Sequence, residues 1–400
     1  MSTPLKPGYK QTEVGVIPDE WRVRPLGEVV DFLDGRRRPV KDSDRAKMRG
    51  DIPYYGASGI VDYVNDFLFD EDLILLGEDG ENILSRNCRL AFKISGKTWV
   101  NNHAHVLRPR SGMTLEYLTE FLESRDYAQY NTGTAQPKLN KLVCSGIPVL
   151  CPPPEEQRAI AEAMGDVDAL LVTLTQLIAK KRDLKQAAMQ QLLTGRQRLP
   201  GFSDTWDHVS LGSLGTWLSG GTPRMSVDQY WSGDIPWASP KDMKVTRLRD
   251  TIDHVSVSAL GNGTRLVPTG AILIVVRGMI LAHSFPVARA ERALAFNQDM
   301  RALVVKDGID SDFVLWWLIA KRDLLLSKTS ESTHGTKRMP TETLFGIKIP
   351  LPRIAEQSAI AAVLSDMDEE LAALERRLAK TRALKQGMMQ ELLTGRTRLV

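Results

Sequence analysis

The chain has 400 residues, of which 42% are hydrophobic and 25% are charged, as is usual for a globular protein. Its net charge of +3 permits nucleic-acid binding without requiring it, so any basic surface must be local. The sequence contains no run of about 20 apolar residues, no C-x-x-C pair and only three cysteines, and its first 21 residues are polar, so a signal peptide is not expected. We therefore expect a cytoplasmic protein of two or three domains, without a membrane span or a disulfide framework.

The first predicted element is an α+β globular domain over residues 1–151. Apolar runs at 72–77 and 98–109 favour strands, and the spacing of apolar residues over 115–124 favours a helix. The domain opens with the segment "WRVRPLGEVVDFLDG", which begins at Trp21.

A long helix is predicted over residues 152–198. Pro152, Pro153 and Pro154 mark its start, and Gly195 marks its end. A helix of about 40 residues is roughly 60 Å long at 1.5 Å per residue. Gly165 disfavours the helix by about 1 kcal/mol and is a candidate break. Apolar residues spaced alternately by four and three positions define a heptad seam on this helix: Ile160, Met164, Val167, Leu171, Leu174 and Ile178.

Residues 199–350 are predicted to form a second α+β domain with a related frame. Its opening segment "WDHVSLGSLGTWLSG" begins at Trp206 and repeats the tryptophan, leucine and glycine positions of the first domain. Apolar runs at 271–278 and 293–305 favour strands, and residues 311–326 favour a helix. The interiors of the two domains differ in sequence, as expected for one architecture that presents two different surfaces.

A second long helix is predicted over residues 351–400, and it repeats the first. Positions 152–199 and 352–399 are identical at 25 of 48 places, and both copies end in nearly the same tag, "LLTGRQRL" and "LLTGRTRL". An isolated apolar seam must be buried, so we predict that the two helices form an antiparallel coiled coil with a pseudo-two-fold axis. The alternative is that each is a core helix of its own domain. The second seam comprises Ile360, Leu364, Met367, Leu371, Leu374 and Leu378. The two seams continue less strictly through Leu184, Ala188 and Leu192 and through Leu384, Met388 and Leu392.

The motifs that would indicate catalysis are incomplete. The segment "SGKTW" lacks the first glycine of a P-loop, because Ala91 occupies that position, and no G-x-G-x-x-G cofactor loop occurs. His103 and His105 share a strand face and could hold a metal, but no further ligand completes the site, so a polar strand face is the better interpretation. Glu78, Asp79 and Glu81 could act as acid–base or metal groups, although the Asp-Gly pair favours a hairpin turn.

The whole chain resembles the specificity subunit of type I restriction–modification systems. The resemblance depends on "EVGVIPDEW" leading into "LGEV", on the P-x-x-E-Q-x-x-I helix entry at 153–160, on its copy at 353–360 with Arg353 in place of the proline, and on the two "LLTG" exits. It implies two target-recognition domains, each reading one half of a split, asymmetric DNA sequence, and two conserved helical spacers. It also implies docking of two methyltransferase subunits and, in the full complex, of motor-nuclease subunits.

Basic and polar side chains are the candidates for DNA contact, because Arg and Lys bind phosphates while Arg, Lys, Gln and Asn can also read base edges. A solvated loop is the alternative at each position. The first-domain candidates are Arg36, Arg37, Arg38, Lys41, Lys47, Arg49, Gln136 and Lys138; the second-domain candidates are Arg224, Lys241, Lys244, Arg247, Lys337 and Arg338.

We therefore expect a non-catalytic DNA-recognition subunit in which the helices set the number of unread base pairs and dock the partners. Lysines and arginines of the spacers, such as Lys185 and Lys385, are expected on their outer faces. This chain is expected to bind no cofactor, while S-adenosylmethionine, ATP and Mg belong to the partner subunits. A coiled-coil interaction scaffold and a self-sufficient DNA-cleaving enzyme remain the alternatives.

Overall fold

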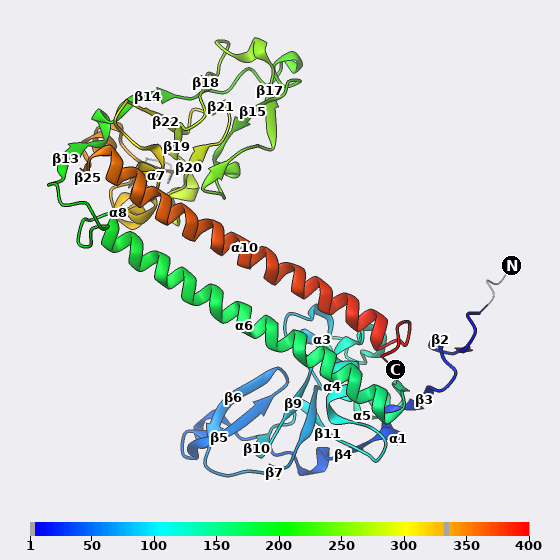
Figure 1. Cartoon of the computed structure of the whole chain (residues 1–400). Helices are drawn as coiled ribbons and strands as arrows, with labels where there is room; N and C mark the ends of the chain where they lie inside the picture. The colour runs from blue at the N-terminus through cyan, green and yellow to red at the C-terminus, as the bar shows by residue number, and fades with distance from the viewer. Residues whose placement is uncertain (1–4, 332–335, 400) are drawn as a thin grey trace. The chain divides into compact units, whose positions relative to one another are not determined.

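The computed structural model describes residues 5–331 and 336–399 of the chain. It divides into two compact units, with Met1–Thr175 and Arg376–Val400 in unit 1 and Gln176–Glu375 in unit 2. Each unit holds one α+β domain and a segment of both long helices, so the unit boundary falls inside the helices (Figure 1). The predicted boundaries between domains and spacer helices, at residues 151, 198 and 350, are not tested by this division and stay a prediction.

The domain of unit 1 contains two four-stranded sheets, ordered β6-β5-β10-β7 and β4-β11-β8-β9, and two strand pairs, β1-β2 and β12-β3. Strand β8 is buried along its whole length because both of its faces are covered. Its strands are β1 Tyr9–Thr12, β2 Gly15–Pro18, β3 Arg22–Pro25, β4 Val30–Phe32, β5 Arg49–Gly56, β6 Gly59–Val64, β7 Phe69–Asp70, β8 Leu73–Gly77, β9 Ala91–Ile94, β10 Lys97–Val100, β11 Ala104–Pro109 and β12 Pro148–Cys151. Its short helices are α1 Leu26–Val29, α2 Asp42–Arg45, α3 Asn82–Ser85, α4 Leu115–Ser124 and α5 Lys141–Ser145.

The domain of unit 2 contains a five-stranded sheet, β14-β22-β19-β20-β16, a four-stranded sheet, β17-β15-β21-β18, and the pairs β13-β25 and β23-β24. Its strands are β13 Asp207–Ser210, β14 Gly215–Ser219, β15 Ile235–Ala238, β16 Arg247–Leu248, β17 Asp253–Val255, β18 Leu266–Val267, β19 Ile272–Val275, β20 Val287–Ala290, β21 Leu294–Phe296, β22 Met300–Val305, β23 Ser330–Glu331, β24 Lys337–Arg338 and β25 Lys348–Leu351. Its helices are α7 Ser311–Ala320, α8 Arg322–Ser327 and α9 Thr341–Gly346.

The two domains share one topology, as the repeated entry signature predicts. In each, the strand after the entry tryptophan pairs with the strand before a long helix, β3 with β12 and β13 with β25. In each, one sheet contains a parallel pair, β5 with β10 and β15 with β21. The other sheet pairs two long strands antiparallel, β8 with β11 and β19 with β22. In the part of the chain that the structure describes, the strands of the two frames therefore correspond, except that unit 2 adds β16 to one sheet and that the pairs β1-β2 and β23-β24 each occur in one unit only.

Two runs that we expected to be single strands are each divided into two. The run at 98–109 forms β10 and β11, and the run at 293–305 forms β21 and β22. The break follows an asparagine in both domains, because its side-chain oxygen accepts a backbone N–H two residues later: His103 N to Asn101 Oδ1 at 2.8 Å, and Asp299 N to Asn297 Oδ1 at 3.1 Å. This local turn ends one strand and redirects the next into the other sheet.

The two long helices are α6, Pro154–Leu192, and α10, Ile354–Leu392. Gly165, the candidate break, does not interrupt α6, because tertiary packing of the seam outweighs its low propensity. Gly195 and Gly395 follow the helix ends with positive φ of 68° and 72°, as a C-terminal cap requires.

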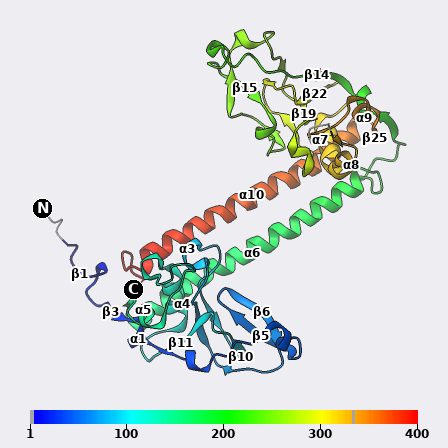
Figure 2. The same ribbon diagram turned by 180° about the vertical axis from the view of Figure 1, so that it is seen from behind.

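Within each unit, the segments of α6 and α10 lie side by side and run in opposite directions (Figures 1 and 2). In unit 2, Lys181 Nζ lies 2.7 Å from Glu370 Oε1, and Lys185 pairs with Asp368. In unit 1, Lys385 Nζ lies 2.6 Å from Asp168 Oδ1. Later residues of α6 thus meet earlier residues of α10.

None of the regularly spaced seam residues is exposed. In the predicted continuation, Leu184 and Leu384 are 48% and 56% exposed, whereas Leu192 and Leu392 are buried. Lys185 and Lys385 turn inward instead of facing partners, since their side chains are only 13% and 15% exposed and Lys185 Nζ lies 4.2 Å from the Trp316 ring centroid. Buried on the seam are Ile160, Met164, Leu174, Ile178, Ile360, Leu364 and Leu371, and half-buried are Val167, Leu171, Met367, Leu374 and Leu378.

A buried glutamine fastens the start of each long helix to its domain. Gln157 accepts a hydrogen bond from Thr114 N at 2.8 Å and donates to the carbonyl oxygens of Gly112 and Pro152. Gln357 accepts from Asp310 N and donates to Pro352 in the same way. The repeated "EQ" of the helix entries therefore satisfies buried backbone groups.

Candidate nucleic-acid interface

In unit 1, the two predicted DNA-contact segments meet at Glu78, just beyond β8. Arg37 Nη1 lies 2.6 Å and Lys138 Nζ 3.3 Å from the Glu78 carboxylate. Burial raises the pKa of Glu78, but the hydrogen bonds from Arg37 and Lys138 and the nearby charges of Arg37 and His105 together outweigh it, and the net shift of the pKa is downward. The sequence places these three residues far apart, and the fold brings them together.

His105 lies beneath this junction and is 1% exposed. Its Nδ1 is 2.7 Å from Asp34 Oδ2 and its Nε2 is 2.8 Å from the Leu139 carbonyl oxygen. Both ring nitrogens therefore face acceptors, which favours the imidazolium. Burial opposes protonation, but the hydrogen bond and the charge of Asp34, together with Cys144, outweigh it, and the pKa of His105 rises to about 10.

The loop containing Gln136 and Lys138 is fixed by main-chain hydrogen bonds to the end of β8. Leu139 N donates to Glu78 O at 2.7 Å, and Gly80 N donates to Pro137 O at 3.0 Å. Asp79 and Lys138 form the bridge between these two bonds. Gln136 is exposed on the loop that this bridge holds.

Unit 2 builds the same bridge with different side chains. Met339 N donates to Val276 O at 2.8 Å, and Gly278 N donates to Lys337 O at 3.0 Å. Arg277 and Arg338 form the bridge between these bonds. Thr333 to Gly335, in the segment predicted to contact DNA, lie outside the described residues.

Sequence reasoning identified Lys337 and Arg338 but missed Arg277, Arg301 and Gln298, which the fold brings to the same place as Arg338. Aligning "NNHAH" with "NQDMR" on the turn asparagines would have found two of them, because Gln298 then corresponds to Asn102 and Arg301 to His105. The domains are too dissimilar for that alignment to be evident without the fold.

The remaining unit 1 candidates divide into paired and unpaired cations. Arg37 is half-buried and also donates to the Ala104 carbonyl oxygen, so its guanidinium is already used within the fold. Arg36 pairs with Glu71 at 3.3 Å and Lys47 with Asp44 at 3.4 Å. Among the described residues, Arg38, Lys41 and Arg49 are exposed and have no ion pair.

In unit 2, the guanidinium group of Arg247, like that of Arg37 in unit 1, is paired within the fold. Its Nη1 lies 3.2 Å from Glu291 and 3.1 Å from Asp312, and its Nη2 donates to Ser365. Lys241 pairs with Asp253 at 2.6 Å. Arg224 and Lys244 are exposed, without an ion pair to any residue in 5–331 or 336–399. All of these positions stay predictions as DNA contacts.

The histidines, carboxylates and "SGKTW" segment do not form catalytic sites. His103 pairs with Asp79 at 2.9 Å while His105 points into the interior, and the described residues contain no group of three side chains suited to a metal ion. The Asp79-Gly80 pair lies in a wider loop with α3 and is not the tight hairpin turn that we expected. Gly96, with φ of 67°, makes the turn between β9 and β10. None of the described helices combines the length and apolarity needed to cross a bilayer.

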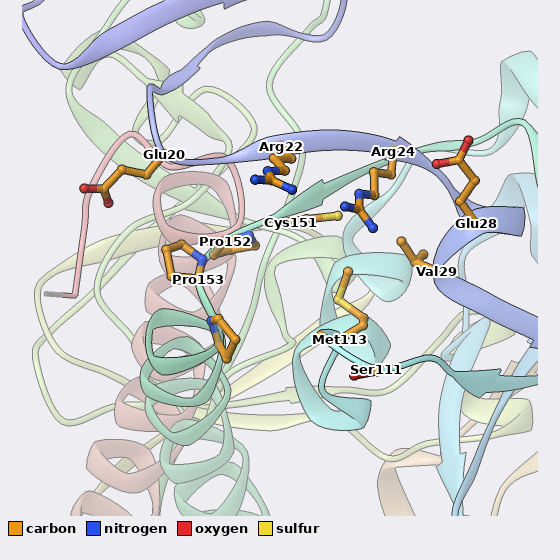
Figure 3. Close-up of a pocket in the computed structure, with 12 residues that line it drawn as sticks. Glu20, Arg22, Arg24, Glu28, Val29, Ser111, Met113, Cys151, Pro152 and Pro153 are labelled. Atoms are coloured by element: carbon orange, nitrogen blue, oxygen red, sulfur yellow. The ribbon is translucent and has the colours of Figure 1, made fainter.

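A pocket of about 360 Å³ lies between β3 and the start of α6 (Figure 3). Arg22 and Arg24 stand over it, flanked by Glu20 and Glu28, so its charge is mixed. Burial raises the pKa of the Cys151 thiol in its wall to about 11, which keeps that thiol neutral. A neutral thiol is a poor nucleophile, so Cys151 is not a reactive cysteine.

Comparison with known proteins identifies the family. The model of the type I restriction modification DNA specificity domain matches twice, at residues 18–185 and 203–381. The Escherichia coli EcoR124I/EcoR124II specificity subunit is 31% identical over 255 residues, which span 62% of this chain and 60% of that protein. The Methanocaldococcus jannaschii MjaVIII specificity subunit is 23% identical over 96% of this chain and 94% of its own length.

Solved structures share the fold. The type I restriction–modification S subunit from M. genitalium superposes with a TM-score of 0.63 at 15% identity, covering 97% of this chain and 99% of that one. A chain from a type I restriction–modification complex gives a TM-score of 0.53 at 19% identity, covering 95% and 99%. With two matches of the family model over most of its length, the chain belongs to the type I restriction–modification DNA specificity family and carries two copies of its specificity domain.

Proposed function

We propose that this chain is the DNA-recognition subunit of a type I restriction–modification complex. Each domain reads one half of a bipartite, asymmetric DNA site, and the helices α6 and α10 set the unread spacing between the halves. One observation carries the proposal: the same main-chain bridge presents Asp79 and Lys138 in one domain and Arg277 and Arg338 in the other. A shared frame with different side chains suits two readers of two different sequences.

The proposal includes partner subunits, as the membership of the specificity family implies. Two methyltransferase subunits, and motor-nuclease subunits in the full complex, carry out the chemistry and hold S-adenosylmethionine, ATP and Mg, all in the cytoplasm. Exposed cations of the spacers, such as Lys180 and Arg382, are available for docking, whereas Lys185 and Lys385 are used between the helices.

Domain exchange tests the proposal directly. Residues 200–350 are replaced by the matching domain of a relative, the chain is expressed with its methyltransferase, and methylated adenines are mapped. Only one half of the methylated sequence is expected to change, while the spacing stays constant. A change in both halves, or in neither, would contradict two independent readers.

The two alternatives give different results. A self-sufficient nuclease would cleave duplex DNA when the purified chain is incubated with Mg²⁺ alone, and we expect no cleavage. An interaction scaffold would show no DNA affinity with its methyltransferase partner, whereas a recognition subunit shows affinity that decreases steeply with salt.

A further inference from the structure

Three arginines of unit 2 converge on one pocket of about 340 Å³. Arg277 follows β19, Arg301 lies on β22 and Arg338 lies on β24, and all three line this pocket together with Gln298. Arg277 and Arg338 are exposed and Arg301 is half-buried. None of the three has an ion pair within the part of the chain that the structure describes. We call this pocket, with the three arginines that line it, the arginine pocket.

The main chain forces two of these charges together. Because the flanking hydrogen bonds run from Met339 N to Val276 O and from Gly278 N to Lys337 O, Arg277 and Arg338 form a non-hydrogen-bonded cross-strand pair. Side chains are closest at such a pair, and like charges directly opposite each other are destabilising. Glu342, the acidic residue of the pocket lining, is not within 4 Å of any of the three guanidinium groups.

The equivalent place in unit 1 is neutralised. There the bridge pairs Asp79 with Lys138, and His105, at the position of Arg301, is paired with Asp34. At this place the first domain therefore carries charges of both signs, whereas the second domain carries three arginines without a paired carboxylate among the described residues. The charges of Arg277, Arg301 and Arg338 are not neutralised within the part of the chain that the structure describes, so they are available to an anion from outside the chain.

Gln298 places a side-chain amide beside the three arginines. Thr222 Oγ1 donates a hydrogen bond to Gln298 Oε1, which fixes the exposed amide. Among the described residues, no acceptor is bonded to its NH₂ group. A fixed glutamine amide can make paired hydrogen bonds to an adenine edge in the major groove.

We propose that Arg277, Arg301 and Arg338 bind backbone phosphates of the half-site read by the second domain, and that Gln298 reads a base edge beside them. This inference depends on the proposed function, because it assigns that function to particular residues. A planar guanidinium binds a phosphate through two parallel hydrogen bonds, which fixes register as well as affinity.

The first test measures salt dependence with the full chain bound to its methyltransferase and a 30-base-pair duplex. Each lost phosphate contact is expected to reduce the slope of log K against log salt by about 0.9, so Arg277→Ala, Arg301→Ala and Arg338→Ala together reduce it by about 2 to 3. The triple Arg→Lys variant keeps the charges and is expected to keep the slope. Arg353→Ala removes an exposed arginine that is paired with Asp204, and serves as the matched control.

The outcomes separate the inference from the proposed function. If the wild-type chain shows no salt-dependent DNA binding, the proposed function fails. If the wild type binds and the folded triple alanine variant has the same slope, the arginine pocket does not bind phosphates. Circular dichroism of each variant, together with the three single substitutions, shows whether the fold is retained.

The second test examines base reading by Gln298. Gln298→Ala is expected to relax one position in one half of the methylated sequence and to leave the salt slope unchanged. An unchanged methylation map would overturn the assignment, as would a change in the half that follows the first domain in the exchange experiment.

Discussion

Arg398 Nε lies 2.6 Å from Glu156 Oε1, although the two residues are 242 positions apart. Trp21 Nε1 donates to the other oxygen of the same fully buried carboxylate at 2.8 Å. The second copy repeats the arrangement, with Arg198 Nε and Trp206 Nε1 on Glu356 at 2.6 and 3.0 Å. Each "LLTGR" tag therefore leads to an arginine that neutralises the glutamate at the start of the other long helix.

Removing Arg398 is expected to destabilise unit 1. Arg398→Ala leaves the Glu156 carboxylate buried without its cation, which costs about 2–4 kcal/mol, and the midpoint of urea unfolding decreases accordingly. Arg396→Ala is the matched control, since Arg396 is 67% exposed and 3.9 Å from Glu391. Adding Glu156→Gln to Arg398→Ala removes the uncompensated charge and is expected to restore part of the loss. Equal midpoints for Arg398→Ala and Arg396→Ala would contradict a buried ion pair.

The His105 cluster predicts a pH-dependent stability. The pKa of His105 is raised from 6.5 to about 10, so its contribution is complete below pH 6.5 and is lost as the pH rises toward 10. We expect the free energy of unfolding to decrease by about 2–4 kcal/mol over this interval, and His105→Gln to remove most of that slope. Urea unfolding at pH 6.5, 8 and 9.5 measures the effect, and parallel curves for wild type and variant would refute it.

The carboxylates of the same cluster, Asp34 and Glu78, affect the stability at low pH. Burial raises the pKa of Asp34, but the hydrogen bonds from His105 and Val106 N and the charges of His105 and Arg37 together outweigh it, so the net pKa is lowered. The stability that Asp34 and Glu78 contribute is present above their usual pKa values and is lost as the pH falls through the lowered ones. Wild-type stability is therefore expected to be greatest between about pH 5 and 6.5 as far as this cluster decides it.

Helix length predicts the spacing of the DNA site. Deleting residues 173–179 and 374–380 removes one heptad from each helix, keeps the seam in phase and shortens each helix by about 10 Å. At about 3.4 Å per base pair, the unread spacing in the methylated sequence is expected to decrease by about three base pairs. Inserting one heptad at the same positions is the matched control and is expected to lengthen it equally. If methylation is retained and the spacing is unchanged, the helices do not set the spacing.

The sequence by itself determined the repeat, both long helices, the strands at 72–77 and 271–278 and the helix at 115–124. These features depend on local spacing of apolar residues and on prolines and glycines at element ends, which are readable along the chain. The resemblance to the specificity family depended on the same local motifs. The Asn101 and Asn297 breaks were missed because a side chain that satisfies the main chain locally outweighed a continuous apolar run.

Only the tertiary structure decided what each charged residue does. Arg37, Arg247, Lys185 and Lys385 are cations in basic runs, yet the fold pairs each with carboxylates from distant segments. Arg277 and Arg301 belong to apolar strand segments, yet the fold gathers them with Arg338. The physical reason is that electrostatic pairing depends on distances of a few ångströms between groups that are tens to hundreds of residues apart. Those distances exist only after the sheets and helices have packed.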